Sequence, residues 1–379
     1  MDYLAECYFN NITRGTTVEA HIADIHFGAM NPKVQYEILC EQFINKICNL
    51  NLDIICIEGD LFDHKVMNNS DVVMYANCFI HDLIELCERK NATLILIYGT
   101  NSHDANQYKS LYHFMNRSKA DIRIIDKVQF EIAKGKKILC IPEMYNMGRE
   151  YYEEYLYSNG GYDSVYMHGT LKNSIFGKNE LDLDSVREPV FDMNCFSFCR
   201  GPIISGHIHV AQCLNNDFYY CGSPYRWCFG EEQPKGFYVL LHNLDARQYY
   251  MHFEEIKSFR YDTVELDDII ISDPKKVVDY ISSLKANGID YIRLKLNKHH
   301  DNNMIIMNYY KNDKSIKIDT SYRNSIILED NQKVLNKYHD LEFLTDPNID
   351  EYEKFCRYVN YKEDCEFITV EELKNILNG

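Results

Sequence analysis

The sequence lacks the features that mark secreted and membrane-spanning proteins. Its 14 cysteines are scattered singly and never form a Cys-x-x-Cys pair, which argues against a disulfide framework or a zinc ribbon and indicates reduced thiols. No stretch approaches the roughly 18 uninterrupted apolar residues of a membrane-spanning helix. The first residues include Asp2 and Glu6 and contain neither the basic nor the apolar segment of a signal peptide. We therefore expect a cytoplasmic protein without membrane contact.

Positive charge is also scarce. The 40 Lys and Arg residues face 57 Asp and Glu residues, which gives a formal net charge of −17. This balance argues against a protein that coats nucleic acid through bulk electrostatics, so a phosphate substrate would need a local basic patch or bound metal cations. What the chain does have is a globular composition, 46% hydrophobic and 26% charged, and at 379 residues enough length for two or three domains.

The first hundred residues alternate between apolar strands and amphipathic helices. We expect strands at 18–27, 53–57 and 92–98, and helices at 32–50 and 70–90. This order implies right-handed crossovers and a parallel sheet that is buried on both faces. Polar residues should then gather at the carboxyl ends of the strands, where open α/β sheets place their sites.

Further along the chain the pattern changes twice. Short strands expected at 137–141, 164–167, 202–205, 218–221, 236–241 and 248–253 predict a second, more antiparallel sheet. A small α/β module should follow, with strands at 263–266, 291–296 and 316–320 and helices at 274–285 and 304–310. The polar tail holds two helical candidates, 350–358 and 370–377.

Clusters of acid, amide or imidazole residues close five of the expected strands. A single Asp or His in such a place is more often a cap or a surface residue, but chance does not readily explain the ordered combination. Mixed imidazole and carboxylate ligands suit Mn, Fe or Zn, and two ions about 4 Å apart can clamp an in-line displacement at phosphorus. The clusters, which together predict a dinuclear metal site, are Asp24–His26, Gly59–Asp63, Gly99–Asp104, Met167–Gly169 and Gly206–His209.

These motifs resemble those of the calcineurin-like metallophosphoesterase superfamily, whose fold is a two-sheet sandwich flanked by helices. The resemblance covers about residues 18–256. Three segments further resemble the stretch that follows the last metal histidine in SbcD-type nucleases and their bacteriophage relatives: Gly222–Arg226, Phe229–Glu231 and Lys235–Phe237. No Arg follows Asp63, where the protein phosphatases of the superfamily have Asp-Arg-Gly, and this argues against phosphoprotein substrates.

The resemblance implies a role for each motif residue. It places Asp60 between the two cations as a bridging ligand. His103 would stabilise the transition state or protonate the leaving oxygen, and Asp104 would orient His103. The resemblance gives the first cation the ligands Asp24, His26, Asp60 and His209, and the second cation Asp60, His168 and His207.

The third motif departs from the family pattern. That pattern is Gly-Asn-His-Asp, with Asn as a ligand of the second cation, whereas Thr100, Asn101 and Ser102 separate Gly99 from His103 here. Alignment on His103 puts Ser102 at the ligand position. Asn101 has the better ligand chemistry but lies one residue out of register. Both alternatives stay open. The irregular motif predicts weaker binding of the second cation and, at worst, an inactive site.

We expect an α/β metallophosphoesterase sandwich at 1–256, a small α/β cap at 257–325 and a partner-binding segment at 326–379. The resemblance implies a DNA nuclease subunit that binds two divalent cations, Mn foremost and otherwise Fe, Zn or Mg. Its partners would be DNA, an SMC-like coiled-coil ATPase and a second copy of the chain. Arg226, beside a Gly-Ser-Pro turn, is a candidate phosphate contact. The alternatives are a stand-alone phosphodiesterase or phosphatase for small molecules and a non-catalytic scaffold.

Overall fold

The computed structural model describes residues 15–319 except 68–69, 105–106, 116, 146, 159, 177–178, 181–189, 232, 267–271, 297–301, and also Asp350, Glu353 and Lys354. The chain forms two compact units, Met1–Asp262 and Thr263–Gly379. The tail helix expected at 370–377 lies outside the described residues, as does most of the one expected at 350–358. In the described part, no helix is long and apolar enough to cross a membrane.

The first sheet of the larger unit contains six strands in the order β16-β15-β1-β2-β3-β4. Strands β1 to β4 run parallel, with β4 at the edge of the sheet, as the alternation of strands and helices predicts. β15 runs antiparallel to β1, and β16 runs antiparallel to β15. The strand bounds are β1 Thr16–Ile22, β2 Ile54–Glu58, β3 Thr93–Ile97, β4 Asp121–Ile125, β15 Gly236–Asn243 and β16 Gln248–Glu255.

The prediction that the last two strands belong to the second sheet is wrong. β15 lies beside β1 and is buried along nearly its whole length, while β16 forms the half-buried edge. The continuous apolar run of β15 is what a strand covered on both faces requires. A hairpin pattern shows that two strands pair with each other, but it does not show which sheet they extend.

The second sheet also contains six strands, in the order β13-β14-β12-β7-β6-β5. Its inner pairs are parallel and only its two outer pairs are antiparallel, so the expected antiparallel character is wrong. The short helix α7 (Arg149–Leu156) lies in the crossover from β6 to β7 and so permits their parallel pairing. The bounds are β5 Gln129–Ala133, β6 Lys136–Ile141, β7 Ser164–His168, β12 Ile203–Gly206, β13 Gln212–Leu214 and β14 Phe218–Tyr220.

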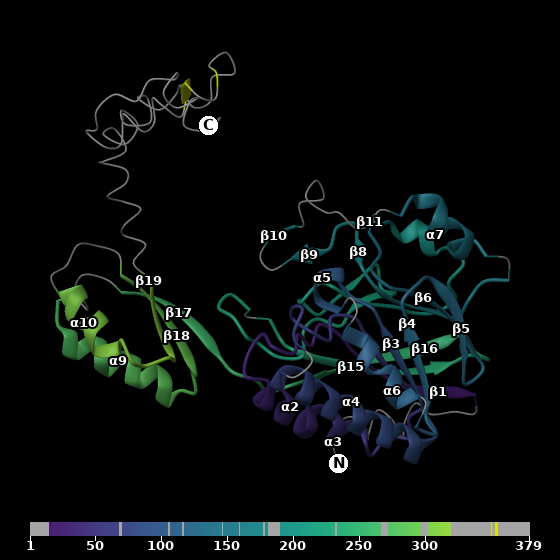
Figure 1. The fold of residues 1–379 in the computed structure, drawn as a ribbon, viewed down its shortest axis with the longest axis horizontal. Helices are drawn as coiled ribbons and strands as arrows, with labels where there is room; N and C mark the ends of the chain where they lie inside the picture. The colour runs from purple at the N-terminus through teal and green to yellow at the C-terminus, as the bar shows by residue number, and fades with distance from the viewer. Residues whose placement is uncertain are drawn as a thin grey trace, which may run out of the picture. The chain divides into compact units, whose positions relative to one another are not determined.

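The two sheets pack face to face between helices, which is the two-sheet sandwich that the sequence predicts (Figure 1). Apolar side chains of both sheets meet in one core, which includes Ile95 and Ile204. A second core lies between the first sheet and its helices, and a third between the second sheet and α7. The helices on the first sheet include α2 Pro32–Leu39, η1 Cys40–Ile44, α3 Asn45–Ile47, α4 Asp71–Lys90 and α6 Tyr112–Met115.

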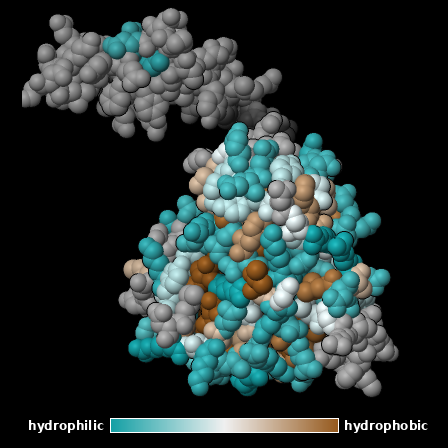
Figure 2. Space-filling model, turned by 90° about the vertical axis from the view of Figure 1, so that its right-hand side faces the viewer, coloured by the Kyte–Doolittle hydropathy of each residue, from teal (hydrophilic) through white to brown (hydrophobic). Residues whose placement is uncertain are grey.

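Several short elements lie in the loops of the larger unit. They are α5 Asn101–Asp104, η2 Gln107–Ser110, η4 Met193–Phe196, β8 Thr170–Leu171, β9 Ile175–Phe176, β10 Asn179–Glu180 and β11 Val190–Phe191. On the face drawn in Figure 2, hydrophobic residues form separate spots among hydrophilic ones.

The smaller unit has the predicted α/β pattern. Its sheet has the order β17-β18-β19, and β18 and β19 run parallel. Val277 and Ile281 of one helix pack in a core with Ile292 and Leu294 of β18. The bounds are β17 Tyr261–Leu266, α9 Pro274–Ala286, β18 Tyr291–Leu296, α10 Asn302–Tyr310 and β19 Ile316–Asp319.

Candidate metal centre

The predicted ligands meet where strands of both sheets end. Asp24 and His26 follow β1 and Asp60 follows β2, while His168 ends β7 and the loop with His207 and His209 follows β12. The parallel strands within each sheet place these ends at one edge. The structure therefore brings together the six residues that the sequence analysis assigns as ligands of two cations, namely Asp24, His26, Asp60, His168, His207 and His209.

The backbone at this edge adopts a conformation that L-residues rarely use. Asp24 and His26 have φ of 50°, Asp60 has φ of 51°, and His207 has φ of 90°. A non-glycine residue held in this region costs on the order of 1–3 kcal/mol, and such residues cluster at functional sites. β1 accordingly ends at Ile22 and not at residue 27 as predicted, because the ligand loop leaves the strand geometry.

Three glycines leave room for the ligands. A Cβ on Gly59 would lie 2.2 Å from His168 Nδ1, and one on Gly206 would lie 2.7 Å from the same nitrogen. A Cβ on Gly99 would lie 2.3 Å from Asp60 Oδ1. All three distances are shorter than any real Cβ contact, so any larger residue would displace a ligand.

One group of ligands surrounds His26. Its Nε2 lies 3.1 Å from Nε2 of His209 and 3.6 Å from Oδ2 of Asp60. A ligand atom of Asp24 lies within 4.8 Å of those of both histidines. Such spacing places several lone pairs around one point, as a cation requires.

The second group surrounds His168. Its Nε2 lies 3.5 Å from Asp60 Oδ2 and 3.5 Å from Glu143 Oε2, and Nδ1 of His207 lies 3.1 Å from the same Glu143 oxygen. Asp60 thus contacts both groups, as a bridging ligand must. Glu143 was not identified from the sequence.

The ring of His168 is held so that its Nε2 faces the site. Its Nδ1 lies 2.7 Å from the carbonyl oxygen of Glu58 and donates to it, so Nε2 is the nitrogen that a cation could bind in place of a proton. Among the described residues, no hydrogen bond reaches the buried atoms Asp24 Oδ2, Glu143 Oε1 and His168 Nε2. Buried polar atoms are nearly always satisfied, so a divalent cation fits these donors.

Charges within the cluster shift the affinity of its groups for protons. Burial raises the pKa of Asp24. Burial also favours a raised pKa for Asp60, but the charge of His168 and the hydrogen bond from His103 outweigh it and hold the pKa well below its usual range. Burial and the charge of His26 lower the pKa of His209 well below its usual value, so this imidazole is neutral and able to bind a cation.

His103 lies beside the shared carboxylate at the mouth of the site. Its Nδ1 is 2.9 Å from Asp60 Oδ2, and its side chain keeps 27% of its surface exposed. Burial alone would lower the pKa of His103, but the hydrogen bond and charge of Asp60 raise it. The partly exposed position and the hydrogen bond to Asp60 suit a proton donor at the entrance, although a ring nitrogen of His103 also lies within 4.8 Å of ligand atoms of His26 and Asp60.

Asp104 holds two loops together. Its carboxylate accepts hydrogen bonds from the backbone N–H groups of Asp60 and Gly99, both at 2.9 Å, and of Phe62 at 3.2 Å. Among the described residues it makes no hydrogen bond to the His103 ring, which differs from the role that the resemblance implies. Burial and the charge of Asp60 raise the pKa of Asp104 to about 7.

The two candidates for the missing amide ligand lie in the short helix α5, where Asn101 and Ser102 are both exposed. Thr100 is the residue that contacts the cluster. Its N–H donates to Asp60 Oδ1 at 2.6 Å, and its hydroxyl lies 3.1 Å from Asp60 Oδ2 and 3.2 Å from Glu143 Oε2. That Asn101 or Ser102 binds a cation stays a prediction.

Arg226 uses its donors within the protein. Its Nε donates to the carbonyl of Glu231 at 2.8 Å, and one terminal nitrogen donates to the carbonyl of Gln233 at 2.9 Å. The neighbouring Trp227 packs with its ring centroid 5.1 Å from those of both His26 and His209. The described contacts therefore show Arg226 fixing a loop; its role as a phosphate contact stays a prediction.

No protein-family model matches the chain. A protein of Invertebrate iridescent virus 6 that is provisionally named phosphoesterase 244L is 25% identical over 266 residues, which cover 67% of this chain and 89% of the viral protein. A solved cold-active protein tyrosine phosphatase of a psychrophilic Shewanella species is 12% identical, covers 62% of this chain and 80% of its own, and has a TM-score of 0.26. Structural similarity this low supports no conclusion about the fold or the function of this chain. The viral relative supports a phosphoesterase-type fold, and the candidate ligand clusters agree with a hydrolase that binds metal.

Proposed function

We propose that the larger unit is a metal-dependent phosphodiesterase that hydrolyses DNA at a dinuclear site. The observation that carries the proposal is the convergence of two ligand groups on Asp60, with buried lone pairs that the described residues do not satisfy. Two divalent cations at such a site neutralise phosphate charge and supply an activated water for in-line displacement.

The chain's own residues then position the substrate and the proton. Asp60 would be the anionic ligand that both cations share, and its oxygens are fixed by Thr100 and His103. Because Nδ1 of His103 bonds to Asp60, Nε2 is the nitrogen left to give a proton to the leaving oxygen. Asp104 keeps the loops of Asp60 and Gly99 at a fixed separation.

The segment that resembles the SbcD-type nucleases supports the choice of DNA as substrate. Lys235 is buried, and its ammonium donates to the carbonyl of His209 at 2.9 Å, to Ser223 Oγ at 2.6 Å and to Glu231 Oε1 at 2.8 Å. The hydroxyl of Tyr225 donates to the carbonyl of Ile25 at 2.5 Å. Lys235 and Tyr225 thus fix the backbone of the two loops that carry His209 and His26. Residues of the SbcD-like segment therefore support the candidate ligands.

The proposed partners follow from the same resemblance. A nuclease of this type would act with an SMC-like coiled-coil ATPase and as a homodimer. The segment expected to bind the ATPase, 326–379, lies outside the described residues except for Asp350, Glu353 and Lys354. Because the formal charge is −17, an anionic substrate would need a local basic patch or bound cations to approach the site.

The test is hydrolysis of linear duplex DNA by the full chain in Mn(II), beside a small phosphodiester and a phosphomonoester. DNA cleavage that is lost in Asp60→Ala supports the proposal. Turnover of the small phosphodiester alone would favour a stand-alone enzyme. Absence of any turnover by a folded chain that binds Mn(II) would favour a scaffold and overturn the proposed activity.

A further inference from the structure

Glu143 occupies a place in the cluster that the motif residues leave open. It follows β6, and its side chain is 1% exposed. Its Oε2 lies 3.1 Å from His207 Nδ1, 3.5 Å from His168 Nε2 and 3.2 Å from the hydroxyl of Thr100. Its Oε1 is buried and has no hydrogen-bond partner among the described residues.

Asn101 lines the same cavity as Glu143, but among the described residues no hydrogen bond joins Asn101 or Ser102 to the cluster. Asn101 and Ser102 are exposed in α5. Thr100, which directly follows Gly99, places its hydroxyl within hydrogen-bond distance of both Asp60 and Glu143 and can donate its proton to either. A hydroxyl in that position orients two carboxylates and does not itself supply the missing anionic or amide oxygen.

An ordinary ion pair between Glu143 and a protonated His207 would explain only part of this arrangement. It would leave Oε1 of Glu143 and Nε2 of His168 buried without a hydrogen-bond partner among the described residues. Three carboxylates, those of Asp24, Asp60 and Glu143, would also share one buried cluster. Burying charge without a partner costs several kcal/mol per ion, so a cation between these groups explains more of the geometry.

We propose that Glu143 coordinates the second cation in place of the amide ligand, with Thr100 orienting it. This inference rests on the proposed function and specifies the ligand set of its second site. A carboxylate adds a negative charge that an amide does not carry, so the second site should bind a hard cation such as Mn(II) tightly. The irregular third motif then no longer implies a weak second cation.

The test measures the Mn(II) content of the full chain after equilibrium dialysis. The wild type should retain both cations, and Glu143→Ala should retain only one. Glu143→Gln preserves shape and should weaken one of the two affinities by at least the roughly tenfold effect of losing an outer-shell partner. Glu150→Ala removes an exposed carboxylate of α7 and should retain both cations, as should Asn101→Ala and Ser102→Ala.

The outcomes separate the inference from the proposed function. If the wild type binds both cations and cleaves DNA, but Glu143→Ala and Glu143→Gln bind Mn(II) with unchanged affinity, the inference is overturned and the function stands. Loss of one cation in Asn101→Ala or Ser102→Ala, with both retained in Glu143→Ala, also overturns it. If the wild type binds two cations but hydrolyses no phosphodiester, the proposed activity is overturned. The role of Glu143 as a ligand is then still decided by the dialysis experiment. Should Glu143→Ala fail to fold, the affinity of Glu143→Gln decides.

Discussion

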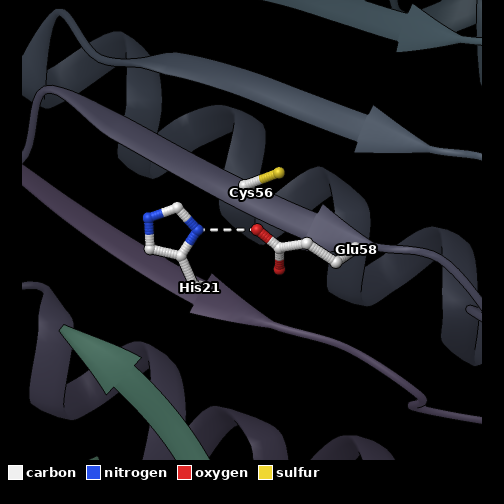
Figure 3. A group of neighbouring side chains, drawn as sticks. All are labelled: His21, Cys56 and Glu58. Atoms are coloured by element: carbon white, nitrogen blue, oxygen red, sulfur yellow. Dashed lines mark hydrogen bonds and ion pairs between the residues drawn. The ribbon is translucent and has the colours of Figure 1, made fainter. Parts of the chain in front are cut away.

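Two clusters of buried charge both draw on strands β1, β2, β6 and β7, and they differ in how their charges are balanced. The interior network, Glu19, His21, Glu58, Lys136 and Tyr166, lies between the sheets. Lys136 donates to both oxygens of Glu19 at 2.8 Å, and His21 Nδ1 lies 2.6 Å from Glu58 Oε1 (Figure 3). The metal cluster at the strand ends instead leaves carboxylate and imidazole atoms unsatisfied among the described residues and holds four ligands at positive φ.

This difference indicates that the interior network stabilises the fold, whereas the metal cluster can bind a ligand. Figure 3 shows the Cys56 thiol beside His21 and Glu58, so distance alone would also make this a metal site. Burial, together with the charge of Glu58, raises the pKa of Cys56 well above its usual value, which keeps the thiol protonated and a poor ligand. His21 and Glu58 already pair with each other, and in the described part of the chain no side-chain N or O atom of the interior network is among the buried atoms that lack a hydrogen-bond partner.

The largest expected effect is on activity, in Asp60→Ala. Loss of the shared carboxylate should lower phosphodiester hydrolysis by several orders of magnitude, because both cations lose a ligand at once. Mn(II) content should fall in the same variant. The matched change beside the interior network, Cys56→Ala, should leave the activity per folded molecule and the metal content unchanged. An active Asp60→Ala protein would contradict the assignment of the metal cluster.

The next largest effect is on folding, in Lys136→Met. This change should lower the free energy of unfolding by about 3–5 kcal/mol, because it leaves the buried charge of Glu19 without its partner. Chemical denaturation monitored by circular dichroism measures it. The double variant Glu19→Gln with Lys136→Met should recover much of the loss. An equal loss in the double variant would mean that packing, and not the charge pair, sets the cost.

His103→Gln should act on chemistry alone. We expect phosphodiester hydrolysis to slow by roughly two to four orders of magnitude, as for loss of a general acid, while both cations stay bound. Steady-state kinetics and metal analysis of one preparation measure the two effects together. Loss of metal would instead make His103 a ligand, and near-normal turnover would remove it from the chemistry.

The smallest expected effect is stabilisation by added metal. Mn(II) at about 100 times its dissociation constant should raise the free energy of unfolding by about 2.7 kcal/mol per site, because only the folded chain presents the ligands. Thermal unfolding of the wild type should show the increase, and Asp60→Ala should show much less. The folded Cys56→Ala protein should respond like the wild type. An equal response of Asp60→Ala would place the binding elsewhere.

The sequence predicted the candidate ligands that lie within recognisable motifs. It did not predict the residues and strands whose place depends on how distant strands pair. Asp24, Asp60 and His168 each end or follow a strand. Because the carboxyl ends of parallel strands lie at one edge of a sheet, the sequence could predict that these side chains come close together. Glu143 follows β6, whose parallel place beside β7 was hidden because the expected pattern was antiparallel. The same kind of non-local pairing put β15 beside β1.

The structure adds contacts for two side chains whose sequence-based roles stay predictions. Arg226 adjoins a turn near the histidine loop, which suggested a phosphate contact, yet two carbonyls of the following loop accept from its guanidinium. Asp104 stands next to His103 in sequence, but its carboxylate contacts the backbone of Asp60, Phe62 and Gly99. Sequence proximity does not fix where a side chain points.

The most direct test of the account is the anomalous scattering of a crystal of the full chain soaked in Mn(II). We expect two peaks that share Asp60 as a ligand, with ligand oxygens about 2.0–2.5 Å from the ions. No peak should lie between His21, Cys56 and Glu58. A peak there, or the absence of peaks beside Asp60, would contradict the claim that unsatisfied buried groups, and not merely clustered ones, mark the metal centre.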